Sequence, residues 1–542
     1  MMAAFGNRRA PLQLEEYTMK RSAQSGQACK LNRRAFMQSA AAVGMASAMT
    51  SAFASAVAAA PKSGGTLRLG ADGGGATDTL NPLQLLGADH TQNAAFCGYD
   101  TLTEMDSNGQ PQPSLAESWE GNPDGTWAIR LRKGVEFHDG KTLTAEDVVW
   151  SLQQHNSETN KNAEGKQIVG NMEEIRADGP DLVLIKQKEV NFDLPSHLSS
   201  FGLLIGQAGT TDWDRGNGTG PYVTENWEPG VRYAGSKFAN FYRDEQGHFD
   251  SVEILNVADP AARASGLLSG SLDAIGSPDV NTATRMNRAS GYELVQVSGT
   301  QHYTTDMRTD TGPLTDPNVR NAVKWALKRQ EIVDNVLGGF ATVGNDIPLA
   351  RNQQFYNDQL PQREYDPEKA KWYLKQSGLD SVDLTFHTSD GAFAGAVDMG
   401  VLMQESMRDA GINLNVKREP ADGYWSNVWM TVPWSASYYN GRPTADWMLS
   451  SQYSSDAQWD ATYFRKPEFD ALLVQARAEE ETSRRKELYF AAQELLWDQG
   501  GVAVLAFVNI LIGASNKLGH GEVGVSRRLD DARLARRWWF NA

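Results

Sequence analysis

The sequence has 542 residues, which is too long for one hydrophobic core and long enough for two or three domains. Its net charge is −16, and residues 1–60 carry seven Lys and Arg against two Asp and Glu, which leaves −21 on the rest. This strongly negative charge argues against binding to nucleic acid or to anionic lipid. The apolar content of 40% is ordinary for a soluble globular protein.

The N-terminus predicts an export signal. Asn32–Met37 is a twin-arginine pattern, and the run Ser39–Ala60 is only weakly hydrophobic, whereas a membrane anchor would be richer in Leu, Ile and Phe. Small-x-small sites predict cleavage near Ala56–Ala60 and a periplasmic location. Removal of residues 1–60 takes Cys29 away, so Cys97 cannot form an internal disulfide and is predicted to be a small buried residue.

The next segments predict a strand, a loop and a hairpin. Thr66–Gly70 alternates as a strand does, and a glycine-rich loop follows at Asp72–Ala76. No Gly-Lys-Ser/Thr follows these glycines, so a phosphate-binding loop is not favoured. In the glycine cluster of residues 216–222 the glycines precede strand-like residues, so that cluster indicates a structural turn rather than a dinucleotide site.

The stretch from Pro113 to Leu152 carries a strand, two turns and a helix. Trp127, Ile129 and Leu131 alternate with polar or small residues, and a turn of residues 122–125 precedes them. A second turn covers residues 137–141. Thr144 then stands at an N-cap position with Asp147 three residues later, which is typical of a capping box before a helix.

Later segments predict further helices. Asp316 and Pro317 are an N-cap and a first helical residue, and apolar residues follow at helical spacing. Asp366 and Pro367 repeat the pattern, and a long helical stretch covers residues 469–501.

The stretch 113–152, the residues Gly218–Tyr222 and these helices resemble, in the same order, the extracellular solute-binding proteins of peptide-type ABC importers, the family that contains dipeptide-, oligopeptide- and nickel-binding proteins. The matches run from Gly65 to about Phe507. The resemblance implies an α/β, periplasmic-binding-protein-like fold of type II, with two lobes and a hinge. It implies hinges near Gln301–Arg308 and Val504–Asn509. The expected parts are lobe I (61–99, 213–303 and 508–542), domain II (100–212) and domain III, the second lobe (304–507).

The sequence contains no recognisable enzyme or metal motif. His-Glu-x-x-His, Cys-x-x-Cys and Gly-x-Ser-x-Gly are absent, and the eight histidines lack metal-ligand spacing. We therefore expect no catalytic residue, no metal and no cofactor.

Six aromatic residues between Tyr424 and Tyr439 suggest a cleft wall. Trp425 and Trp429 share a face if they lie on a helix, and Trp434, Tyr438 and Tyr439 follow Pro433. Aromatic rings suit a ligand cleft because they offer large rigid area, although packing onto the lobe is the alternative interpretation for the two tryptophans.

The resemblance supplies the other candidates. Peptide binders of the family carry an Asp for the solute amino group where this chain has Ser437 or Tyr438, which puts an ordinary amino-terminus clamp in doubt. Asp446 is a possible substitute, with a helix N-cap as the alternative, and Arg442 is suited to a carboxylate. Loop and hinge positions add Thr77, Asp78, Tyr303 and Arg308. The predicted solute contacts are Thr77, Asp78, Tyr303, Arg308, Trp425, Trp434, Tyr438, Tyr439, Asn440, Arg442 and Asp446.

The resemblance thus predicts a monomeric periplasmic protein that captures a peptide or opine-like zwitterion between two lobes and delivers it to an ABC permease. A periplasmic hydrolase, a sensor or chaperone-like holdase and a carrier of a chelated metal stay open as alternatives.

Overall fold

The computed structural model describes residues 61–84 and 87–541. The predicted twin-arginine motif, the apolar run, the cleavage sites near Ala56–Ala60 and Cys29 lie outside these residues. Within the described part, no helix has both the length and the apolar character needed to cross a membrane.

A sheet of eleven strands forms the backbone of the fold. Its central pair, β12 and β17, is antiparallel, and β13 joins β17 outside the main path. The strand order is β15 (Ile412–Arg418), β14 (Val382–Thr388), β16 (Trp434–Tyr439), β12 (Tyr292–Met307), β17 (Val502–Ser515), β11 (Ala274–Gly276), β1 (Thr66–Ala71), β10 (Ser251–Asn256), β9 (Arg232–Lys237) and β8 (Tyr222–Glu228), with β13 at Ala341–Val343.

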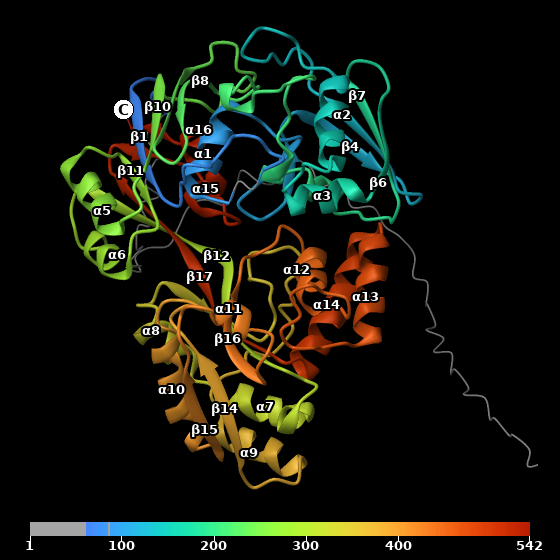
Figure 1. Cartoon of the computed structure of the whole chain (residues 1–542), viewed down its shortest axis with the longest axis vertical. Coiled ribbons are helices and arrows are strands. Elements are labelled where there is room, and N and C mark those ends of the chain that lie inside the picture. The colour runs from blue at the N-terminus through green and yellow to red at the C-terminus, as the bar shows by residue number, and fades with distance from the viewer. Residues whose placement is uncertain (1–60, 85–86, 542) are drawn as a thin grey trace, which may run out of the picture. The chain divides into compact units, whose positions relative to one another are not determined.

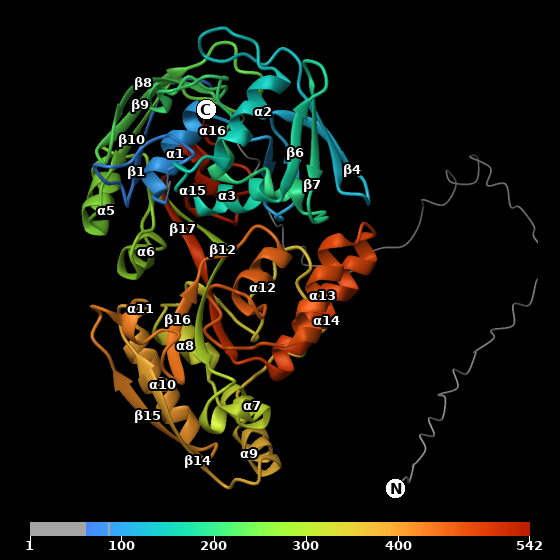
Figure 2. The same ribbon diagram turned by 45° about the vertical axis from the view of Figure 1, so that its right-hand side comes forward.

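Strands β12 and β17 pass from one hydrophobic core to another (Figures 1 and 2). Val295 and Ile510 pack into a core built on β1, whereas Met307 and Leu505 pack into a second core built on β14. Their pairing is irregular between Ser298 and His302, between the two cores. The two strands are therefore the covalent connection between the lobes, in the region where the sequence predicted the hinges.

The first core, which we call the lobe I core, joins residues from both ends of the chain. Cys97 is buried in it, as predicted. Besides the strands of the main sheet, this part of the structure holds α1 (Asp89–Gly98), α5 (Pro260–Ser269), α6 (Val280–Met286), α15 (Arg528–Ala532), α16 (Leu534–Arg537) and the short strands β18 (Leu518–Gly519) and β19 (Trp539–Phe540).

A separate core lies between a four-stranded antiparallel sheet and its helices; we call it the domain II core. Thr144 and Asp147 form the predicted capping box of α2, and backbone hydrogen bonds close the predicted turns at Asn122–Gly125 and Phe137–Gly140. The elements are β2 (Thr103–Met105), β3 (Pro111–Pro113), β4 (Ala116–Gly121), β5 (Thr126–Leu131), α2 (Ala145–Gln153), α3 (Ala163–Gly170), β6 (Met172–Ala177), β7 (Leu182–Gln187) and α4 (Leu194–His197).

The second lobe has two adjoining cores, one around β14 and β16 and one around the two long C-terminal helices. Asp316 and Asp366 cap α7 and α9 through their side chains, each with the predicted proline directly after the cap. The helices are α7 (Pro317–Trp325), α8 (Arg329–Asn335), α9 (Pro367–Gln376), α10 (Ala396–Arg408), α11 (Tyr424–Asn427), α12 (Ala445–Tyr453), α13 (Pro467–Ala478) and α14 (Thr482–Gln499).

Candidate functional site

An aromatic face lies where β12 and β16 pair beside the crossing strands. Tyr303 and Tyr438 stand opposite each other in the ladder, and both are only partly buried. Phe393 stacks on Tyr303 with ring centroids 3.9 Å apart and an angle of 7° between the planes. Trp425 presents its edge to Tyr438 at 5.4 Å and is 38% exposed. These four rings form an apolar surface that a solute can cover, with two hydroxyl groups to orient it.

Arg442 follows this surface in the chain and is an unusual cation. Its guanidinium carbon lies 5.3 Å from the ring centroid of Trp459 and 5.9 Å from that of Trp447. Its Nε is buried without a hydrogen-bond partner among the described atoms, and no carboxylate of the described chain lies within ion-pair distance. Burial lowers the pKa of Arg442, Glu164 raises it and Arg527 lowers it further. A half-buried guanidinium without an ion-pair partner is suited to receive an anion.

Lobe I brings two more arginines to the same junction. The guanidinium of Arg527 lies 4.0 Å from the ring centroid of Phe201. Arg528 is half exposed, and its Nη1 lies 3.6 Å from Oδ2 of Asp89. Burial raises the pKa of the Tyr303 hydroxyl while Arg528 acts in the opposite direction, so Arg528 lies near the aromatic face.

The segment that presents these arginines is strained. Leu529, Asp530, Asp531 and Ala532 have φ values of 54°, 58°, 56° and 59°, a left-handed turn without glycine. This conformation costs about 1–2 kcal/mol per residue. Asp531 Oδ1 accepts hydrogen bonds from the backbone N–H groups of Ser526 (2.8 Å) and Arg527 (2.7 Å), which hold the turn in place. Strain of this kind persists where the surrounding structure over-determines it, and it is common at ligand sites.

A cavity of about 1020 Å³ lies between elements of domain II and of the second lobe. Trp447 and Trp459 form part of its wall, and the ring of His197 meets Trp447 edge-on at 5.3 Å. Contacts across this boundary include an ion pair of Asp193 with Arg485 and a hydrogen bond from Phe192 N to Arg477 O (3.0 Å). The cavity is large enough for a small organic solute.

Comparisons with known proteins decide the class of the chain. The sequence profile for the bacterial extracellular solute-binding proteins, family 5, matches residues 110–460, which is more than half of the chain. The chain belongs to this family.

Individual relatives agree. The glutathione-binding protein GsiB of Escherichia coli K12 is 26% identical over 459 residues, which covers 79% of this chain and 86% of the relative. The structure resembles the periplasmic protein DppA from Helicobacter pylori in complex with the peptide STSA (20% identity, TM-score 0.69, 89% and 99% coverage). It also resembles AgaA from A. tumefaciens R10 in complex with agropinic acid (18% identity, TM-score 0.69, 88% and 99% coverage).

Family 5 membership confirms three predictions. The fold is the predicted two-lobed α/β binding-protein fold, and the protein is a solute-binding component of an ABC importer rather than an enzyme. The family acts outside the cytoplasm, in the periplasm or extracellularly, and hands its solute to a membrane permease.

Four of the predicted contacts have other roles in this family 5 protein. Trp434 is fully buried in the core against Phe386 (5.0 Å between centroids), so its ring is packed and is not open to a cleft in this structure. The buried hydroxyl of Tyr439 donates to Asp306 Oδ2 at 3.0 Å. Both side chains are packed because β16 is covered on both faces for most of its length.

The two charged residues among these four are occupied by partners. Arg308 forms a two-fold contact with Asp310 (3.0 and 2.9 Å) and stacks on Tyr463, so its guanidinium already has a counter-charge. Asp446 is buried and paired with Arg477 at 3.1 Å, and burial raises its pKa to about 6 despite that pair. The carboxyl of Asp446 is therefore already paired and is not free to bind an amino group. The N-cap of α12 is Thr444 rather than Asp446.

Some of the remaining predicted contact residues lie in the glycine-rich loop, and others lie near the aromatic face. Asp78 accepts hydrogen bonds from Gly75 N (3.0 Å) and from the Thr91 hydroxyl (2.5 Å), which is the loop-capping role, and Thr77 beside it is exposed. Asn440 is exposed and accepts from Gln301 Nε2 at 2.9 Å. Trp425 and Trp429 do not share a helix, because α11 ends at Asn427, yet their rings still meet at 5.5 Å.

Sequence analysis missed Arg527, Arg528, Glu164 and Phe393. Two adjacent arginines followed by two aspartates, at residues 527–531, were the available signal for the first pair. Glu164 and Phe393 carry no local signal, since they reach the junction only through the packing of domain II and of α10.

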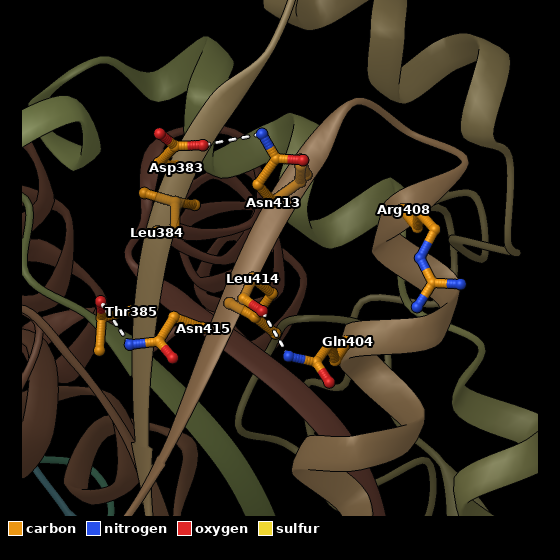
Figure 3. Close-up of a pocket in the computed structure, with 9 residues that line it drawn as sticks. Asp383, Leu384, Thr385, Gln404, Arg408, Asn413, Leu414 and Asn415 are labelled. Atoms are coloured by element: carbon orange, nitrogen blue, oxygen red, sulfur yellow. Dashed lines mark hydrogen bonds between the residues drawn. The ribbon is translucent and has the colours of Figure 1, made fainter.

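Another pocket, of about 590 Å³, lies on the outer side of the second lobe between β14, β15 and α10 (Figure 3). Its polar groups largely satisfy one another: Asn413 donates to Asp383 (2.7 Å) and Gln404 to the Leu414 carbonyl (2.7 Å). It lacks aromatic residues and unpaired buried charge, so it is a poor solute site. In the part of the chain that the structure describes, no group of three or more His, Cys, Asp or Glu side chains is arranged to hold a metal ion.

Proposed function

We propose that the protein captures a peptide or a peptide-like amino-acid conjugate, such as an opine, at the junction of lobe I, domain II and the second lobe. The aromatic face of Tyr303, Phe393, Trp425 and Tyr438 covers the apolar part of the solute. Arg442 binds a carboxylate of the solute. The related proteins whose names mention glutathione, a peptide and agropinic acid support this class of solute.

The single observation that carries the proposal is the state of Arg442. Two tryptophans flank its guanidinium, and none of the described carboxylates pairs with it. The buried Nε of Arg442 has no hydrogen-bond partner among the described atoms, and an anion that accepts from it would remove that cost. A solute that contacts both lobes stabilises the closed arrangement by its differential affinity for that state.

Solute release tests the proposal directly. The exported form is purified without added ligand and denatured, and mass spectrometry identifies the small molecules released. A panel of dipeptides, oligopeptides and opines is then screened by thermal shift, because a ligand at 100 times its Kd adds about 2.7 kcal/mol of stability. A nickel–histidine arm distinguishes a chelated metal, and absence of a shift with every peptide-like compound contradicts the proposal.

Arg442→Gln tests the site itself. We expect about tenfold to hundredfold weaker binding of the compound found by the screen, because a charge-assisted hydrogen bond contributes about 1.5–3 kcal/mol. Calorimetric titration measures the change. Arg408→Gln is the matched control, since this exposed arginine lies on the outer side of the second lobe (Figure 3). Equal affinities of the two variants would remove Arg442 from the site.

The export route and the organisation of the chain belong to the same proposal. The protein leaves the cytoplasm by the twin-arginine route, is cleaved near Ala56–Ala60 and acts in the periplasm as a monomer. Its parts are lobe I (61–99, 213–303, 508–542), domain II (100–212) and domain III (304–507). The separate hydrophobic cores support this division, with Trp447 the one second-lobe residue that packs into the domain II core. Light scattering and N-terminal sequencing of the exported form test these points.

A further inference from the structure

Three arginines gather at the junction. Arg442 comes from the second lobe, and Arg527 and Arg528 come from lobe I. Carboxylates near them include Glu164 of α3, Asp89 of α1, which contacts Arg528 at 3.6 Å, and Asp531, whose Oδ1 accepts a hydrogen bond from Arg527 N. Of the three guanidinium groups, that of Arg528 forms an ion pair among the described residues.

Arg527 and Arg442 both contact side chains at the edge of domain II. Arg442 lies over Trp447, whose ring meets that of His197 of α4 at 5.3 Å. Arg527 lies over Phe201, and the hydroxyl of the preceding residue, Ser200, donates a hydrogen bond to Glu164. After burial, Glu164 raises the pKa of Arg442 and Arg527 lowers it. Like charges repel one another, and an anion bound between the two guanidinium groups relieves that repulsion.

Neither guanidinium has a carboxylate of its own within ion-pair distance among the described residues. Two buried arginines of the second lobe do have one: Arg363 and Arg329 both hold Asp346 at 2.7 Å. The left-handed turn at residues 529–532 and the hydrogen bond to Asp531 fix the backbone of Arg527, and Phe201 packs against its guanidinium.

The geometry points to a solute with a net negative charge, which places one carboxylate on Arg442 and a second anionic group on Arg527. This inference rests on the proposed function, since it assigns the solute class of the same site. A guanidinium accepts a carboxylate in a two-fold planar contact, so two such groups select a dicarboxylate by shape as well as by charge. Glu164 is left to receive the amino group of the solute.

Matched Glu and Gln compounds test the charge alone. The pairs are Ala-Glu and Ala-Gln, and Ala-Glu-Ala and Ala-Gln-Ala. We expect the Glu member to bind about tenfold or more tightly than its Gln partner in each pair that binds, with an advantage that shrinks as salt is added. Equal binding, or tighter binding of the Gln member, overturns the inference while leaving the proposed function in place.

Arg527→Gln and Arg527→Lys separate charge recognition from folding. In Arg527→Gln, the affinity for the Glu compound is expected to fall to within about twofold of the affinity for its Gln partner, which is itself unchanged. Arg527→Lys is expected to retain part of the preference for the Glu compound. The control Arg408→Gln is expected to keep the full ratio of the affinities for the Glu and Gln compounds. If Arg527→Gln also keeps that ratio, the second anionic group of the solute does not bind at Arg527. If no compound of any pair binds the parent protein, the proposed function itself fails and this inference falls with it.

Discussion

Replacing Asp346 by Asn is expected to destabilise the second lobe by about 3–5 kcal/mol. Asp346 is fully buried and lies 2.7 Å from both Arg329 and Arg363. Burial opposes its ionisation, but the two arginines and Lys324 outweigh burial and lower its pKa. Without this carboxylate, the two buried guanidinium groups lose their counter-charge. Asn fits the site sterically, because Asp346 has a φ of 59° and Asn tolerates that conformation.

Urea unfolding followed by tryptophan fluorescence measures the loss. Asp310→Asn is the control, since Asp310 is an exposed carboxylate that also pairs with an arginine; it is expected to change stability by less than about 1 kcal/mol. An unfolding midpoint of Asp346→Asn equal to that of the parent contradicts the prediction.

Lys324→Met provides a second measurement if Asp346→Asn fails to fold. Lys324 is completely buried, and burial followed by the nearby Arg363 lowers its pKa well below the ordinary value. Its Nζ has one hydrogen bond, to the Trp497 carbonyl at 3.1 Å. Met has a similar length and no charge to desolvate, so this substitution is expected to stabilise the parent protein and to recover part of the loss in Asp346→Asn. Destabilisation in both backgrounds would show that Lys324 is held favourably.

The sequence predicted the local elements well because their signals are local. The Asp-Pro starts of α7 and α9 and the capping box at Thr144 depend on residues within one helical turn. Family resemblance then supplied the order of the parts, which periodicity alone could not.

Side-chain exposure in the site depended on packing that no local pattern carries. Alternation along β16 puts Trp434 and Tyr438 on the same face, but it does not predict which end of the strand is buried. Phe386 buries Trp434, whereas Tyr438 stands at the open end beside Trp425. The turn that presents Arg527 was less predictable still, because four non-glycine residues in the left-handed region contradict every local preference.

Asp306, on the strand β12 that crosses between the lobes, makes stability fall as pH rises. The carboxyl is buried, and burial raises its pKa to about 7, against the opposing effect of the nearby hydroxyl groups of Thr304, Tyr439 and Ser437. In the unfolded chain Asp ionises near its ordinary pKa of 3.8. Between these two values the folded protein holds a proton that the unfolded chain has released, so increasing pH favours unfolding. The difference between the two pKa values corresponds to a loss of about 4 kcal/mol in the free energy of unfolding, and this loss is complete above about pH 7.

Asp306→Asn removes that titration while retaining a group that accepts the Tyr439 hydrogen bond. The variant and the parent are therefore expected to have similar stability near pH 4, and the variant to be more stable by up to about 4 kcal/mol near pH 8. Parallel urea titrations of the variant and the parent give the difference in their free energies of unfolding at each pH. The contributions of the other titrating groups cancel in this difference. Asp310→Asn again serves as the control: Arg308 lowers the pKa of Asp310, so its contribution is lost only as pH falls below about 4. A difference for Asp306→Asn that is constant from about pH 4 to about pH 8 would mean that Asp306 is ionised in the folded protein, and the hinge strand would then carry a buried charge.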